Sequence, residues 1–325
     1  MMKLNVFVKQ LKKLLMHTSK LNFFFERLFF NPSLLDWVLI LLFSPFSLLY
    51  ALLMLLRRIF TFKKSYAVPI VSIGNLTVGG SGKTPFVITL AKEYDDVTII
   101  SRGYGRQSKG LLEVSRRGDI LSDVFSSGDE AMLMAKSLSK ASIILSEKRE
   151  VAIDKAIKEG AKVIFLDDGF NRINIRKYEI LLFPKIIKNY FTFPSGPFRE
   201  FFFMKYFSDL SLYEEQDFKR VVKIVNQTER MLLVTAISNP DRLNSFLPKG
   251  VIDKVYLDDH AYFNEERLNK KMLEVGATSL LVTQKDEVKM QDFKLSLSVM
   301  KLELEIKNEV LEKINNYIEE YPNAR

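Results

Sequence analysis

The residues of this 325-residue chain whose types and spacing most directly indicate chemistry lie between Val68 and Thr84. A short apolar run breaks there into a glycine-rich turn that ends in Gly82-Lys83-Thr84. Glycines let several backbone N–H groups converge on phosphate oxygens, and a helix that follows them adds its positive N-terminal end. In such a loop the lysine neutralises the β- and γ-phosphates and the Thr hydroxyl holds Mg²⁺. The stretch therefore predicts a strand, a phosphate-binding loop and the start of a helix.

The loop departs by one residue from the pattern G-x-x-x-x-G-K-[ST], because Thr77 stands where the first Gly is expected. We expect Gly79 and Gly80 to supply the flexibility instead. A glycine-rich hairpin turn is the alternative, but the strand-like run before the loop and the apolar helical pattern after it favour phosphate binding. The residues expected to contact the nucleotide are Thr77, Val78, Gly79, Gly80, Ser81, Gly82, Lys83 and Thr84.

Two carboxylates, Asp167 and Asp168, directly follow a second apolar run. Open parallel α/β sheets bind ligands at the carboxyl ends of their strands, so we expect these side chains beside the phosphate loop. Asp167 is expected to bind Mg²⁺ through water or through the Thr84 hydroxyl, and Asp168 to face the substrate or support the site. A turn residue without chemical function is the alternative for either Asp.

Three further groups are candidates. Arg102-Gly-Tyr-Gly-Arg106 follows a predicted strand and indicates a mobile cationic loop suited to phosphate or sugar, or else a solvated turn. Asp129 and Glu130 open a predicted helix, where capping is the simpler explanation of their charge. His260 follows two carboxylates at a predicted strand end, and these would orient it or raise its pKa. A structural role is the commoner one for such a His.

The order of the predicted elements indicates an α/β fold. Strands and helices alternate from residue 68 to 183, which predicts a P-loop NTPase-like parallel sheet with helices on both faces. A smaller α/β unit is expected from about Arg220, with strands at 221–225, 231–236, 251–257, 280–283 and 297–304 and helices at 265–275 and 309–321. The expected domains are an N-terminal membrane-associated helical segment (1–64), a kinase-like core (65–215) and a smaller C-terminal domain (216–325).

The N-terminal segment suits a membrane. Residues 37–56 carry no charge, and a helix of this length measures about 30 Å, the thickness of the bilayer core. Ten Lys or Arg against two acidic residues in 1–64 suit anionic headgroups. Pro45 and the basic flanks on both sides favour a helix or bent helical pair embedded from one side. A single span and a buried soluble helix are the alternatives, and residues 4–30 resemble a second interfacial element.

Composition excludes several kinds of site. The chain has no Cys, which rules out disulfides, thiolate nucleophiles and Cys-based zinc sites. Its two His residues are too few for a multi-His metal site. The net charge of +9 comes almost entirely from residues 1–64, where it brackets an apolar run, so we expect no nucleic-acid partner. The sequence does not indicate an oligomeric state.

Taken together and in this order, the motifs resemble those of the tetraacyldisaccharide 4'-kinase family, membrane-bound kinases of lipid A. The similarity covers about residues 37–305. A phosphate loop with Thr in its first position and Pro85 directly after it is unusual outside this family. The motifs that carry the resemblance are FSPFSLLYALLMLLRR, SIGNLTVGGSGKTP, SRGYGR, GDE, VIFLDDGF, FPSGPFRE, SNPDR, DDH and LLVTQKD.

The resemblance implies ATP- and Mg²⁺-dependent transfer of the γ-phosphate to the 4'-hydroxyl of a tetraacylated glucosamine disaccharide 1-phosphate, which gives lipid IVA. It implies a location at the cytoplasmic face of the bacterial inner membrane, in contact with membrane lipids. It also implies three catalytic residues. Asp129 acts with His260 on the sugar hydroxyl, by taking its proton or by orienting it, once the C-terminal domain closes over the core, and Lys83 acts on the phosphates. The implied metal residues are Thr84, Asp167 and Glu130, and the implied substrate residues are Arg102, Tyr104, Arg106, Asp168, Asn171 and Arg199.

Some positions depart from the family pattern. Asn171-Arg172 stand where a Gln-His pair is common, so a His role is lost and Arg172 could contact phosphate instead. Ile237-Ser238 replace the glycines usual before the Asn-Pro turn, and residues 1–30 extend beyond the usual start.

Two other functions fit part of the pattern. One is a membrane-attached P-loop ATPase or GTPase switch that hydrolyses nucleotide without a sugar acceptor, and the other is a non-enzymatic nucleotide-dependent scaffold. Thr283-Gln-Lys-Asp286 suggests a guanine-specificity motif, but its Lys does not directly follow the Thr, so we discount it. The GDE motif and His260 favour the kinase.

Overall fold

The computed structural model describes residues 24–79 and 82–321, which belong to two compact units. The first unit combines the N-terminal segment up to Phe62 with Leu76–Gly79 and Pro184–Ser208, and the second contains the remainder. The segments expected at 65–215 and 216–325 thus share the second unit, apart from these two pieces. The predicted interfacial element before residue 24 lies outside the described residues, as do Gly80 and Ser81 of the loop.

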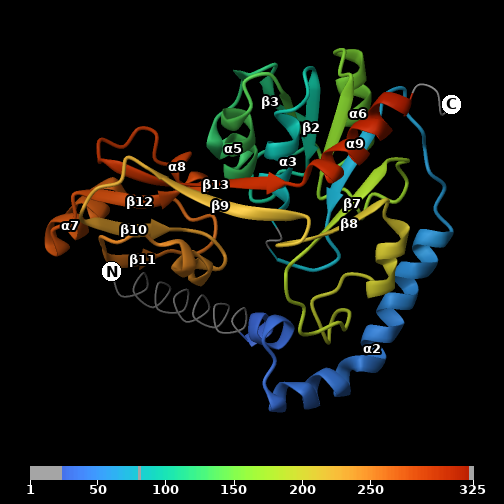
Figure 1. Ribbon diagram of the computed structural model, residues 1–325, viewed down its shortest axis with the longest axis horizontal. Helices are drawn as coiled ribbons and strands as arrows, with labels where there is room; N and C mark the ends of the chain where they lie inside the picture. Colours follow the sequence, from blue (N-terminus) through green and yellow to red (C-terminus); the bar gives the residue numbers. More distant parts are fainter. Residues whose placement is uncertain (1–23, 80–81, 322–325) are drawn as a thin grey trace, which may run out of the picture. The chain divides into compact units, whose positions relative to one another are not determined.

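Eight strands form the larger sheet of the second unit, in the order β4-β3-β5-β2-β6-β1-β7-β8 (Figure 1). The central strands are buried apolar runs that pair in parallel, as strands covered on both faces require. One edge is antiparallel, formed by β3 and β4, and this edge was not predicted. The strands are β1 (Ile70–Gly74), β2 (Val97–Ser101), β3 (Leu112–Arg116), β4 (Asp119–Ile120), β5 (Ser142–Leu145), β6 (Val163–Asp167), β7 (Tyr178–Phe183) and β8 (Leu210–Tyr213).

Helices cover both faces of the larger sheet, which confirms the prediction. One set of alternating strand residues packs against α3 (Lys83–Ala91), α5 (Asp129–Ser137) and α9 (Asn308–Glu320). The other set packs against α6 (Arg149–Lys158). Neighbouring residues of β1 belong to different clusters because successive side chains of a strand point to opposite faces.

Five strands form the smaller sheet, in the order β11-β10-β12-β13-β9. Its α7 (Glu265–Val275), which begins and ends where predicted, packs on one face. The antiparallel pair β9–β13 extends beyond this sheet to α3 (Figure 1). Phe218 at the start of β9 packs edge-on against Phe86 of α3. The β9–β13 pair therefore joins the two sheets. The strands are β9 (Phe218–Val225), β10 (Met231–Thr235), β11 (Val251–Tyr256), β12 (Ser279–Thr283) and β13 (Leu297–Ile306).

In the first unit, the predicted apolar segment forms one continuous helix, α2 (Leu34–Ile59). The Ser33 hydroxyl caps its N-terminus. Pro45 lies inside the helix and has no N–H to donate to the carbonyl of Leu41. The hydroxyl of Ser44 donates to that carbonyl instead, at 2.7 Å. The backbone is thereby satisfied and α2 continues through the proline as a single helix.

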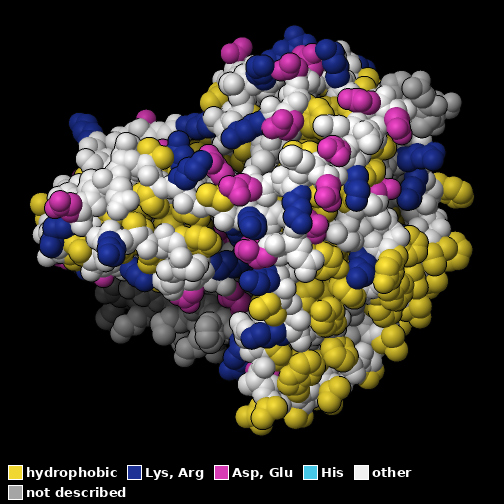
Figure 2. All heavy atoms as spheres, in the orientation of Figure 1, with side chains coloured by type: hydrophobic (Ala, Val, Ile, Leu, Met, Phe, Trp, Pro, Cys, Tyr) yellow, Lys and Arg dark blue, Asp and Glu magenta, His cyan; other side chains and the backbone are white. Residues whose placement is uncertain are grey.

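The side chains of α2 are largely apolar and largely exposed (Figure 2). Within the described ranges, α2 is the one helix long and apolar enough to cross a membrane, and only 17% of its most apolar window is buried. At its C-terminal end Arg58 is buried and pairs with Glu200, with nitrogen–oxygen distances of 2.8 and 2.9 Å. An exposed apolar surface of this length indicates a non-aqueous partner.

Candidate active site

The predicted phosphate loop connects β1 to α3. Gly79 and Gly82 have φ values of +90° and +81°, a left-handed conformation that favours glycine. Lys83 is the first residue of α3. Its Nζ donates to Asn75 Oδ1 at 2.9 Å and lies 3.5 Å from Asp168 Oδ1. The loop lysine is therefore held by side chains at the ends of β1 and β6.

The first residues of the loop make their contacts within the first unit. Thr77 forms an antiparallel bridge with Phe198, and the Val78 N–H donates to the carbonyl of Pro197 at 2.8 Å. These bonds fix the start of the loop to the turn that carries Arg199, one of the predicted substrate residues.

Asp167 ends β6 and is buried. Its Oδ2 accepts a hydrogen bond of 3.0 Å from the Ser101 hydroxyl at the end of β2. Its Oδ1 has no hydrogen-bond partner among the residues that the structure describes. Burial, and after it the charge of Glu130, raises the pKa of Asp167 to about 6. A cation beside this carboxylate would satisfy the oxygen and lower that pKa.

In residues 24–79 and 82–321 no group of three or more His, Cys, Asp or Glu side chains is placed to hold one ion.

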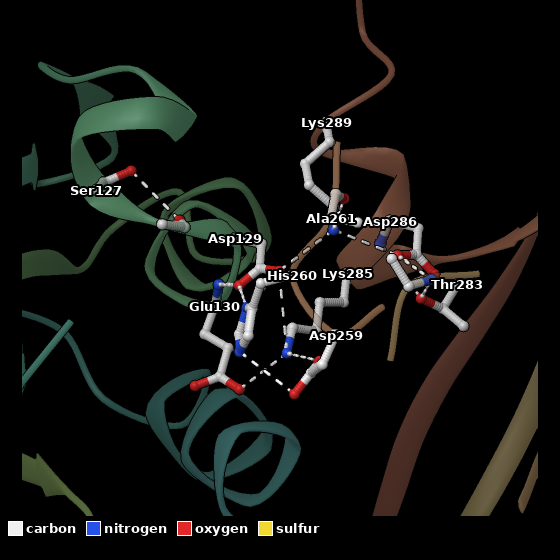
Figure 3. Close-up of polar contacts among 12 residues, drawn as sticks. Ser127, Asp129, Glu130, Asp259, His260, Ala261, Thr283, Lys285, Asp286 and Lys289 are labelled. Carbon is white, nitrogen blue, oxygen red and sulfur yellow. Dashed lines mark hydrogen bonds and ion pairs between the residues drawn. The ribbon is translucent and has the colours of Figure 1, made fainter. Parts of the chain in front are cut away.

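Asp129 and His260 are in contact, although 131 positions separate them in the chain (Figure 3). Asp129 is the first residue of α5 and is buried. His260 lies in the turn after β11, with φ +61°, and its N–H donates to the carbonyl of Ala236 at 3.0 Å. The His260 Nδ1 lies 3.0 Å from both carboxylate oxygens of Asp129. The two sheets thus each supply one member of the pair.

The electrostatics of this pair favour its charged form. The hydrogen bond that His260 donates to the Asp129 carboxylate, opposed by burial, raises the pKa of His260 above its ordinary value. Burial alone would raise the pKa of Asp129, but the His260 hydrogen bond and the charge of Lys285 outweigh it and the pKa is lowered. At neutral pH Asp129 is therefore ionised and faces a hydrogen-bond donor.

Two lysines that the sequence analysis did not single out complete this cluster (Figure 3). Both belong to the segment around α8 (Gln284–Glu287), which follows β12. Lys285 Nζ lies 3.3 Å from Glu130 Oε1 and 3.9 Å from Asp129 Oδ2. Lys289 Nζ lies 3.4 Å from the same Asp129 oxygen. The motif LLVTQKD at a strand end contains Lys285 and was interpreted only as a guanine motif and as part of the resemblance, whereas Lys289 lies outside it.

The loop after β2 lies beside His260. The Tyr104 ring is 70% exposed, and its centroid lies 5.6 Å from that of His260. The Arg106 guanidinium, predicted to contact substrate, instead turns inward and pairs with Glu147 at 2.6 Å. Arg102 is exposed. Of the three predicted substrate residues in this loop, Arg102 and Tyr104 present accessible side chains.

The structure brings the predicted residues together in two groups, Lys83 with Asp168 and Asp129 with His260. Glu130 follows Asp129 directly in the chain, and its charge contributes to the raised pKa of Asp167. Two other predicted site residues of the second unit, Thr84 and Asn171, have half-buried side chains.

One further cation of the site was missed by the sequence analysis. Arg220 of β9 lies against Gly82, where a Cβ would come within 3.1 Å of its guanidinium. No motif around Arg220 indicated this contact, which depends on how β9 runs past the loop.

A strand, a glycine loop and a helix that begins with Lys-Thr, at the carboxyl edge of a parallel sheet, define a P-loop nucleotide-dependent enzyme. A family model described as Tetraacyldisaccharide-1-P 4'-kinase matches residues 39–216 and 204–319. The chain belongs to this family.

Individual proteins of the same family are also similar to this chain. The tetraacyldisaccharide 4'-kinase of Helicobacter acinonychis is 51% identical over 300 residues, which cover 92% of this chain and 96% of the relative. That of Aliarcobacter butzleri is 43% identical over 314 residues, with 93% and 99% covered. A solved structure of LpxK from Aquifex aeolicus, described as in complex with ATP, matches with a TM-score of 0.74 at 26% identity, over 86% of this chain and 99% of that one.

Proposed function

We infer that the chain is an ATP-dependent kinase that transfers the γ-phosphate to the 4'-hydroxyl of a tetraacylated glucosamine disaccharide 1-phosphate, giving lipid IVA. Membership of the family supports the activity. The observation that carries the acceptor chemistry is the contact between Asp129 and His260. A kinase needs a group that activates the acceptor hydroxyl, and a buried ionised carboxylate with a His partner meets this need.

Asp129 is the group that receives the acceptor proton. As the bond from the 4'-oxygen to the γ-phosphorus forms, the bond from that phosphorus to the bridging oxygen of ADP breaks, and the hydroxyl proton passes to the carboxylate. His260 donates from Nδ1 to Asp129 and keeps the carboxylate oriented. The Nε2 of His260 lies 3.6 Å from Asp259, which limits rotation of the ring.

The loop from Thr77 to Thr84 receives the triphosphate. Lys83 is held by Asn75 and Asp168 and exchanges these partners for phosphate oxygens when ATP binds. Arg220, which lies against Gly82, adds a positive charge from β9 at the same end of the loop. The glycolipid is contacted by Arg102, Tyr104, Asp168, Asn171 and Arg199, and Arg106 supports the loop through Glu147.

Mg²⁺ would be held by Thr84, Asp167 and Glu130 together with phosphate oxygens of the nucleotide. The buried Oδ1 of Asp167 fits this assignment, because it has no hydrogen-bond partner in the described part of the chain. When bound, the metal neutralises negative charge on the phosphates.

The helix α2 attaches the enzyme to the cytoplasmic face of the inner membrane. Its exposed apolar surface suits acyl chains, and its last turn carries Arg57 and Arg58, of which Arg57 is exposed and suits anionic headgroups. An acceptor with four acyl chains resides in the same bilayer, so attachment keeps enzyme and acceptor together.

The test is an assay of detergent-solubilised protein with γ-labelled ATP and the disaccharide 1-phosphate. We expect a bis-phosphorylated lipid that carries the label, and no comparable release of phosphate when the acceptor is omitted. Release of inorganic phosphate at the same rate with and without acceptor, and without labelled lipid, would instead indicate the nucleotide switch.

A further inference from the structure

Lys289 follows α8 and reaches toward the start of α5 (Figure 3). Its Nζ donates to the carbonyl of Ala261 at 3.1 Å and lies 3.4 Å from Asp129 Oδ2 and 3.5 Å from Asp286 Oδ1. The side chain is 2% exposed, and its ammonium lies 5.0 Å from the centroid of the Phe263 ring. A lysine is rarely buried to this extent unless its charge is paired.

The second partner, Asp286, is anchored to the smaller sheet. It is fully buried and accepts hydrogen bonds from Thr235 Oγ1 (2.6 Å), the Ala236 N–H (3.1 Å) and Thr283 Oγ1 (2.7 Å). The carbonyl of Ala236 in turn accepts from the N–H of His260. The end of β10 therefore fixes both the backbone of His260 and the anion that holds Lys289.

Both oxygens of Asp129 have fixed partners besides His260. Oδ1 accepts from the N–H of Glu130 at 2.9 Å, and Oδ2 faces the ammonium of Lys289. A carboxylate held on both oxygens keeps one orientation before substrate arrives, which is the condition for efficient proton transfer.

The neighbouring lysine provides a contrast. Lys285 is 19% exposed and lies near three carboxylates, Glu130 at 3.3 Å, Asp259 at 3.8 Å and Asp129 at 3.9 Å. The partly exposed ammonium of Lys285 thus lies among three carboxylates, whereas the buried ammonium of Lys289 pairs with Asp129 and Asp286.

We propose that Lys289 is a positioning residue for the transfer reaction: anchored by Asp286, it fixes the Asp129 carboxylate against His260. This role rests on the proposed function of Asp129 as the group that receives the acceptor proton. It predicts that Lys289 acts on catalysis only through Asp129, and not through nucleotide binding.

The experiment is a double-mutant cycle with Lys289→Met and Asp129→Asn in the full-length protein, with kcat and the KM for ATP measured for each variant. Methionine keeps the length of the stem and removes the charge. We expect Lys289→Met to lower kcat by about 10²-fold, since misplacement of a reacting group by about 1 Å has this effect. The KM for ATP should change by less than about twofold, because Lys289 is not expected to contact the nucleotide and its loss should not alter how tightly ATP binds.

In the Asp129→Asn background the same substitution should lower kcat by less than about threefold, because the group it positions is gone. An equal loss of kcat in both backgrounds, or a loss that appears in KM, would overturn the proposal. Lys223→Met, which removes an exposed pair with Glu303 on the smaller sheet, is the control and should leave kcat unchanged.

Loss of the charge leaves Asp286 buried without its cation, so folding is checked by circular dichroism. If Lys289→Met is unfolded, Lys289→Arg replaces it in the same cycle, because it keeps the charge and moves the donor atoms. Its loss of kcat should again depend on Asp129, and independence from Asp129 would refute the positioning role. Wild-type turnover in Asp129→Asn alone would refute the proposed function itself, which is a separate outcome.

Discussion

The motif residues of the phosphate side of the candidate site follow strands of the larger sheet, and the smaller sheet adds Arg220 of β9 beside Gly82. The acceptor side instead pairs residues of the larger sheet's helix α5 with residues of the smaller sheet's turns. The phosphate side consists of Gly82, Lys83, Thr84, Asp167 and Asp168, which follow the neighbouring strands β1 and β6. The acceptor side consists of Asp129, His260, Lys285 and Lys289, from the start of α5 and from turns after β11 and β12.

Because of this difference, nucleotide binding and activation of the acceptor should depend on different contacts of the fold. Strand pairing within the larger sheet sets the positions of the motif residues of the phosphate side, and the smaller sheet contributes Arg220 beside Gly82. Nucleotide handling should therefore depend less on the contact between the smaller sheet and α5 than the acceptor chemistry does. The acceptor side exists only while the turns of the smaller sheet contact α5, so its chemistry should depend on that contact. Substitutions on the two sides should therefore give different kinetic signatures.

The largest effect is expected at Lys83. Lys83→Ala removes the ammonium that neutralises phosphate charge, and turnover should fall by roughly 10³-fold or more, with weaker ATP binding. Steady-state kinetics and a nucleotide-binding titration measure the two effects. Near-normal activity of the variant would show that this loop does not bind the phosphates of ATP, and the assignment of the phosphate side would be wrong.

Asp129→Ala should lower turnover by roughly 10³-fold while ATP binding changes little, because the lost group acts on the acceptor. Single-turnover kinetics with bound ATP measure this directly. The control is Asp123→Ala, which removes an exposed carboxylate that caps α4 (Val124–Ser127) and should leave turnover intact. If the variant instead loses only affinity for ATP, Asp129 acts on the nucleotide and not on the acceptor, and the division into two sides would be wrong.

His260→Ala should lower turnover by about 10²-fold, less than loss of Asp129, because in the proposed mechanism His260 only orients the carboxylate that it contacts. Added imidazole should restore part of the activity by entering the vacated space. If imidazole restores nothing while the variant remains folded, the backbone turn at His260, with its φ of +61°, is the important feature instead of the ring.

The smallest expected effect is a change in protein stability on substitution of Asp167, a residue of the phosphate side. The folded-state pKa of Asp167, about 6, lies well above the ordinary value for an Asp, so the ionised buried group destabilises the fold at pH above 6. In metal-free buffer at pH 7–8, Asp167→Asn should therefore raise the free energy of unfolding by about 1–3 kcal/mol. The gain should shrink as pH falls from about 6 to about 4, because the wild-type carboxyl becomes protonated first in the folded state and then in the unfolded state.

Urea denaturation across this pH range measures the gain. The same variant should lose activity if Asp167 holds the metal. An Asp167→Asn variant that is both active and no more stable than the wild type would contradict the assignment on two counts.

The elements of both sheets with strong apolar patterns were predictable. The helix at 265–275 has the bounds expected, and the strands ending at Asp167 and Phe183 end where the sequence indicated. The strands β3, β4 and β8 were missed because they are short and partly exposed, so they lack both a continuous apolar run and a clear alternation. These strands form because they pair with neighbouring strands near the two edges of the larger sheet.

The two sides of the site also differed in predictability. The phosphate side follows from local order, since a loop motif and a strand end identify its residues. The pairing of Asp129 with His260 came from resemblance to a family, because no spacing rule connects residues 131 positions apart. Lys289 was missed because nothing in its neighbourhood in the sequence distinguishes a lysine folded into the interior from one on the surface.

The buried ion pair of Arg58 with Glu200 has a mechanical consequence. It fastens the last turn of α2 to the residue that directly follows Arg199, within the same unit. A tilt of α2 that displaced Arg58 would pull on the backbone next to this candidate glycolipid contact. If α2 is embedded in a bilayer, a mismatch between its apolar length and the bilayer thickness is one influence on its tilt, and Arg58–Glu200 would transmit such a tilt to the backbone beside Arg199.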